Sequence, residues 1–158
     1  MLPSDNLVPM CSPEEALEWA MSVEDGLGRG IDDFILRPVA AFYRMGVSTI
    51  GSCQGHNNRG LPFPWIQISP SSLERANILL EKYPLPGWSV AILRGTEEVF
   101  VRLMPVPTPE EGIRLIADNQ KLLPGDGDPR LRRRLLVRLE YNQDSINQWA
   151  DQMLALGS

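Results

Sequence analysis

The segments WSVAIL (88–93) and VFVRLM (99–104) constrain the fold most, because only the five residues RGTEE separate them. Both segments are rich in β-branched and aromatic residues, and a short polar connection that contains glycine is typical of a hairpin. VSTIGS (47–52) and WIQIS (65–69) form a second pair of strand-like segments. Strands that come in pairs, without regular βαβ units, predict an antiparallel or mixed sheet of four strands.

Helix starts are marked by capping side chains followed by proline and acidic residues. SPEE (12–15) and TPEE (108–111) each place a hydroxyl, a proline and two glutamates in the order that begins a helix. Gly46 is suited to end a helix that would contain Pro38, and this proline would shorten that helix or begin it with a tight turn. The predicted helices cover residues 13–24, 33–45, 71–83, 109–121 and 129–155.

These elements together predict an α+β fold, with helices packed on one face of the sheet. A chain of 158 residues is long enough to bury a core, and we expect one domain over residues 1–158. Residues 28–104 would form its core, and residues 105–158 a helical C-terminal part. Apolar positions along the last segment predict a long amphipathic helix, which would lie across the sheet or pair in a homodimer; they are 131, 135, 139, 146, 149 and 153.

Composition excludes several classes of protein. The net charge of −5 disfavours non-specific binding to nucleic acid, although the arginines of RLRRRLLVR (130–138) are locally basic. No apolar run approaches the roughly 18 residues of a membrane span, so we expect no membrane partner. The N-terminal segment lacks the features of a signal peptide, and two cysteines do not make a disulfide framework, which favours a cytoplasmic location.

The candidate site is the stretch TIGSCQGHNNR (49–59), which holds the only histidine of the chain. Its glycines would allow backbone N–H groups to approach an anion or another ligand closely. His56 would act as a general acid or base, and Cys53 as a nucleophile if His56 lowered its pKa. The side chains or backbone expected to contact a ligand belong to Ser52, Gln54, Gly55, Asn57 and Arg59.

Other interpretations of this stretch remain open. A cysteine at the end of a strand is most often a small buried apolar residue, and polar loops rich in glycine and asparagine are usually turns. Cys53 and His56 also have a C-x-x-H spacing that can bind zinc, but Cys11 would be the only further sulfur or nitrogen ligand. We therefore predict no metal site.

Asp32 and Asp33 precede the predicted helix that leads into this strand. Either they cap the helix, or the helix start and the loop meet at one end of the sheet and share a ligand. Arg37 would then pair with a carboxylate or stabilise the loop. In the C-terminal segment, Arg130, Arg134 and Arg138 are four residues apart and would form one line, either as a solvated helix face or as contacts to nucleic-acid phosphates; they are the weaker candidates.

Residues of about 28–104 resemble the wybutosine-synthesising tRNA methyltransferases, which use S-adenosylmethionine. The matching positions are Gly30, Ile31, Asp32 and Asp33, followed by Thr49, Ser52, Cys53 and Gly55, with Gln54 and His56 standing where that family has serine and arginine. The shorter pattern SCQGH is also similar to that of uncharacterised bacterial and phage proteins. The resemblance implies a shared scaffold, and S-adenosylmethionine as the cofactor if a reaction occurs.

We therefore expect a small polar or nucleotide-like ligand to bind at the SCQGH loop, with nucleotide-directed group transfer as the reaction class that the resemblance implies. The alternative is a non-catalytic protein-interaction module of phage or mobile-element origin. Its contact surface would be the C-terminal amphipathic helix, with Trp149, Met153 and the arginine row. A third hypothesis is tRNA binding through residues 130–138.

Overall fold

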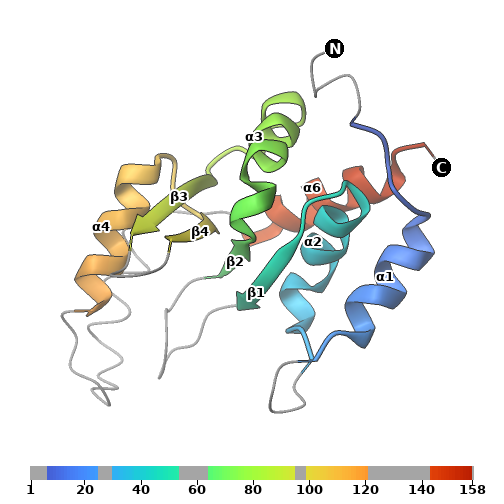
Figure 1. Cartoon of the computed structure of the whole chain (residues 1–158), viewed down its shortest axis with the longest axis horizontal. Coiled ribbons are helices and arrows are strands. Elements are labelled where there is room, and N and C mark those ends of the chain that lie inside the picture. The colour runs from blue at the N-terminus through green and yellow to red at the C-terminus, as the bar shows by residue number, and fades with distance from the viewer. Residues whose placement is uncertain (1–6, 25–29, 54–63, 95–98, 121–142, 158) are drawn as a thin grey trace.

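The computed structural model describes residues 7–24, 30–53, 64–94, 99–120 and 143–157. Four strands form one antiparallel sheet in the order β1-β2-β4-β3 (Figure 1). The α+β class predicted from the paired strands is therefore confirmed. The elements are α1 (Pro13–Ser22), α2 (Asp33–Arg44), β1 (Thr49–Cys53), β2 (Trp65–Ile68), the 3₁₀ turn η2 (Pro70–Ser72), α3 (Leu73–Lys82), β3 (Ser89–Arg94), β4 (Val99–Met104), α4 (Pro109–Gln120) and α6 (Gln143–Ala155).

Helices cover both faces of the sheet, which corrects the expectation of helices on one face. The main core joins Ile66, Ile68 and Leu103 of the sheet to the buried sides of α1, α2, α3 and α6. Side chains alternate along a strand, so Ala91 points to the opposite face from Val90, which packs against the main core. On that opposite face α4 lies against the sheet: a side-chain carbon at Gly112 would come within 3.4 Å of the Ala91 Cβ.

Helix α2 is continuous through Pro38, contrary to the expected shortening. A proline at this position cannot donate a hydrogen bond to the Phe34 carbonyl four residues earlier. Asn147 of α6 replaces that donor, because its Nδ2 donates to the Phe34 carbonyl oxygen at 3.0 Å. A tertiary contact therefore compensates for the local defect, and it does so across 113 positions of sequence.

Helix α6 is part of the core. Its apolar side packs against α2, and Ile146, Trp149 and Met153 are at most 3% exposed. The indole Nε1 of Trp149 donates to the Tyr83 carbonyl oxygen at 2.9 Å. Trp149 and Met153 therefore do not form the exposed contact surface expected for a protein-interaction module or a homodimer. The predicted helical residues 129–142 lie outside the described residues.

Arg44 holds both ends of the described chain to α2. Its side chain is 3% exposed, and it donates from Nε to the Cys11 carbonyl oxygen at 3.0 Å and from Nη1 to the Met153 carbonyl oxygen at 2.8 Å. Met153 lies in the last turn of α6, where carbonyl groups have no donor within the helix. The guanidinium is therefore a C-terminal cap for α6 as well as a link to the N-terminal segment. In the ranges given above, no helix combines the length and apolar character needed to cross a membrane.

Candidate functional site

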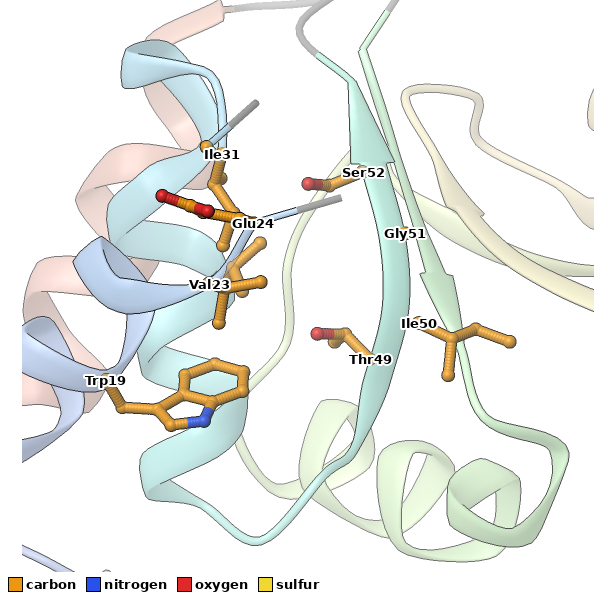
Figure 2. Close-up of a pocket in the computed structure, with 10 residues that line it drawn as sticks. Trp19, Val23, Glu24, Ile31, Thr49, Ile50, Gly51 and Ser52 are labelled. Atoms are coloured by element: carbon orange, nitrogen blue, oxygen red, sulfur yellow. The ribbon is translucent and has the colours of Figure 1, made fainter. Parts of the chain in front are cut away.

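A cleft of about 260 Å³ lies between β1 and the segments that join α1 to α2 (Figure 2). One wall is the strand that carries the start of the candidate stretch 49–59. The other wall combines the end of α1 with the two chain segments that meet at an isolated bridge between Glu24 and Gly30. The lining residues are Trp19, Val23, Glu24, Gly30, Ile31, Val39, Thr49, Ile50, Gly51 and Ser52.

An irregularity in β1 brings two hydroxyl groups to the same cleft. Residues three positions apart on a regular strand face opposite sides. The register of β1 against β2 shifts between Thr49 and Gly51, which is the signature of a β-bulge. Figure 2 shows the consequence: the Thr49 and Ser52 hydroxyls both project toward α1 and α2, whereas Ile50 points away from them. Both hydroxyl residues are partly exposed, so a ligand in the cleft would meet two groups that donate and accept hydrogen bonds.

The wall opposite β1 is mainly apolar and is held rigidly. Trp19 stacks face to face on Tyr43 of α2, with ring centroids 4.0 Å apart and planes within 6°. Val23 and Ile31 add apolar surface beside it. Glu24 supplies the only carboxylate among the described lining residues, and it is exposed to solvent. No lysine or arginine lines the described part of the cleft, so its local charge is negative.

The predicted site residues are only partly brought together. Ser52 lines the cleft, and Asp32 occupies the N-cap position of α2 directly after Ile31, a cleft residue. The Asp32 side chain makes no capping hydrogen bond to α2. Asp33 lies exposed in the first turn.

Arg37 does not contribute to the cleft. Its Nε lies 3.0 Å from the Asp151 carboxylate of α6, and both side chains are at least half exposed. A solvent-exposed ion pair of this kind contributes at most about 1 kcal/mol to stability. Arg37 therefore pairs with a carboxylate of α6, and the ligand-site role given to it stays a prediction.

Several predicted site residues lie outside the described residues. These are Gln54, Gly55, His56, Asn57 and Arg59 of the loop, and Arg130, Arg134 and Arg138 of the C-terminal segment. Cys53 ends β1, where its backbone is paired with Trp65. The roles given to these residues stay predictions.

Sequence reasoning missed the residues of the wall opposite β1. Trp19, Val23 and Glu24 belong to the predicted helix 13–24, which was identified from its capping motif alone. Their place in the cleft depends on the bridge between Glu24 and Gly30, for which no short-range pattern exists. Thr49 could have been found, because it is a hydroxyl-bearing residue within the candidate stretch 49–59.

The other cysteine has the properties of an inactive thiol. Burial is the main reason why the pKa of the Cys11 thiol is raised; the Glu15 carboxylate adds to this effect, and Arg44 partly opposes it. A raised pKa keeps the thiol protonated and therefore weakly nucleophilic.

Over the residues described, no three His, Cys, Asp or Glu side chains gather in a way that would hold a metal ion.

Comparison with known proteins adds no relative: no protein-family model, no curated protein and no solved structure matches this chain.

Proposed function

We propose that the cleft beside β1 binds a nucleoside-like ligand, with its hydroxyl-bearing part at Thr49, Ser52 and Glu24. The main support for this proposal is the β-bulge, which directs the Thr49 and Ser52 hydroxyls into one cleft. The same cleft is lined by the Glu24 carboxylate and by an apolar wall. A carboxylate and hydroxyl groups that line one cleft are suited to a ribose, because the carboxylate accepts hydrogen bonds from the sugar hydroxyls. The apolar surface of Val23 and Ile31 is suited to a planar base.

Size and charge narrow the ligand class. Ligand pockets commonly enclose about 300–1,000 Å³, and the cleft of about 260 Å³ is near the lower end of that range. A nucleoside-sized group therefore fits the cleft better than a dinucleotide. The Glu24 carboxylate repels anions, so we expect the uncharged sugar and base, rather than a phosphate, to occupy this part of the site.

The described cleft supports binding better than catalysis. Its polar side chains are two hydroxyls and one exposed carboxylate, and it contains no paired nucleophile and base. The resemblance to S-adenosylmethionine-dependent enzymes supports an adenosine-containing ligand. Of that cofactor, the adenosine half is the part that a cleft of this character would hold.

The proposal is tested by isothermal titration calorimetry with adenosine, guanosine and S-adenosylmethionine on the intact chain. Thr49→Val keeps the shape of the side chain and removes its hydroxyl, and Ser52→Ala and Glu24→Gln remove the other polar contacts. Each change should weaken binding by about 5- to 30-fold, as expected for the loss of one hydrogen bond of about 1–2 kcal/mol.

Glu18→Gln is the matched control, because Glu18 is exposed on α1 and does not line the cleft. It removes the same charge as Glu24→Gln and should leave binding unchanged. Native mass spectrometry of the purified protein would reveal a retained ligand directly. Absence of binding at millimolar nucleoside, or equal affinity in the wild type and all three cleft variants, would reject the proposal.

A further inference from the structure

Among the described residues, the sheet face covered by α4 carries an arginine that has no acidic partner. Arg102 of β4 is partly buried, and its guanidinium lies 4.5 Å from the centre of the Trp65 ring and 5.9 Å from that of Phe100. Its Nε donates to Oε1 of Gln67 at 3.3 Å. Within the described chain no carboxylate pairs with it. Arg37, in contrast, pairs with Asp151.

Neighbouring side chains hold the Arg102 guanidinium in place and remove part of its hydration. Trp65, Gln67 and Arg102 share one face of neighbouring strands, because Gln67 is paired with Arg102 in the β2–β4 ladder. Burial lowers the pKa of Arg102 from its usual value, but a guanidinium stays charged at any physiological pH. A cation that is partly desolvated and uncompensated is costly for the protein alone, and an incoming anion would relieve that cost.

The guanidinium opens into an apolar groove. This groove, of about 580 Å³, runs between the sheet and α4, which lies beside β3 in Figure 1. Its apolar lining comes from Leu93 and Phe100 of the sheet and Ile113, Ile116 and Ala117 of α4. Ile113 is 45% exposed, so the groove presents apolar surface to solvent. Its volume is within the usual range for sites that hold small organic molecules.

Charge selects the class of ligand. No aspartate or glutamate is among the described lining residues. A planar guanidinium matches a carboxylate through two parallel hydrogen bonds. One partly buried cation balances one negative charge, which favours a carboxylate over a doubly charged and strongly hydrated phosphate. The rest of the ligand must be apolar to match the walls.

We propose that this groove is a second binding site, distinct from the cleft beside β1, for a small carboxylic acid with an apolar body. Arg102 binds the carboxylate, Trp65 and Gln67 hold the guanidinium in place, and the side chains of α4 cover the apolar part. The proposal does not depend on the nucleoside cleft.

The test compares two probes that differ only in their head group, 4-phenylbutyrate and 4-phenyl-1-butanol, by calorimetry and by amide chemical shifts. The wild-type protein should bind the acid with 1:1 stoichiometry and about tenfold or more tighter than the alcohol, because a charge-assisted hydrogen bond is lost in the alcohol. Acetate, which lacks the apolar body, should bind far more weakly than 4-phenylbutyrate.

Variants assign the effect to the groove. Arg102→Gln should abolish the preference for the acid and leave the affinity for the alcohol within about twofold. Arg114→Gln is the matched control, because Arg114 is exposed on α4 and does not line the groove. Ile113→Glu places a negative charge at an exposed groove position and should weaken binding of the acid more than binding of the alcohol. This variant therefore tests the proposal even if Arg102→Gln does not fold. The proposal is overturned by any of three results: the wild type binds the two probes equally well, it does not bind the acid, or the folded variants Arg102→Gln and Ile113→Glu keep the preference for the acid.

Discussion

The hydrogen bond from Asn147 to the Phe34 carbonyl should matter only because residue 38 is proline. In the wild type, Asn147→Ala removes the donor of a partly buried carbonyl that has no helical partner. The expected loss is about 1 kcal/mol in the free energy of unfolding, the usual net contribution of such a bond. For a chain of this size, that loss lowers the melting temperature by roughly 2–4 °C.

A double-mutant cycle with Pro38→Ala isolates this effect. In the Pro38→Ala background the alanine N–H can donate to the Phe34 carbonyl within the helix, so losing Asn147 should cost close to nothing. The predicted coupling energy is therefore about 1 kcal/mol. Alanine is a better helix former than asparagine, but this advantage is the same in both backgrounds and cancels in the cycle.

Urea unfolding followed by circular dichroism measures all four proteins. Gln148→Ala is the matched control, because Gln148 is the exposed neighbour of Asn147 on α6 and has no part in the bond. It should show no coupling with Pro38→Ala. If Asn147→Ala costs the same in both backgrounds, to within about 0.3 kcal/mol, then Asn147 does not compensate for the proline and the reasoning is refuted.

Two further predictions concern Arg44 and Cys11. Arg44→Met removes the donors of two chain-end carbonyls and should lower the free energy of unfolding by about 2–4 kcal/mol in urea titrations, whereas Arg114→Met, at an exposed position, should change it by less than about 0.5 kcal/mol. A loss at Arg44 no larger than at Arg114 would show that the two bonds contribute little. Because the pKa of Cys11 is raised, its alkylation by iodoacetamide at pH 8, followed by mass spectrometry of the peptide that contains it, should be slower than that of a free thiol. Glu15→Gln removes a contribution that raises this pKa and should speed the reaction; faster alkylation in the wild type than in free cysteine would contradict the assignment.

The elements were predictable because their signals are local. The SPEE motif forms the predicted capping box: the Ser12 hydroxyl accepts from the Glu15 N–H at 3.1 Å, and the Glu15 carboxylate accepts from the Ser12 N–H at 3.3 Å. Gly46 follows the C-cap of α2 with a φ of 80°, as expected for a residue that ends a helix. The hairpin of β3 and β4 and the position of α4 follow from similar short-range patterns.

The site was less predictable because it depends on contacts between distant segments. The loop was singled out for its rare residue types, whereas the cleft is built by a bulge in β1 and by a bridge between Glu24 and Gly30. Neither feature leaves a periodic trace in the sequence. The prediction that helices cover one face of the sheet was wrong for a related reason. Side chains on both faces of the strands are buried by helices, but the sequence does not show which helix packs on which face.

Arg44 also has a consequence for the order in which the molecule is assembled. One of its two acceptors, the Met153 carbonyl, lies 109 positions later in the sequence, so it is synthesised well after the segment that contains Arg44. Until then the buried side of α2 lacks both its partner helix and the acceptor for a charged group. Helix α2 therefore keeps apolar surface uncovered in the nascent chain until α6 has been synthesised and can pack against it.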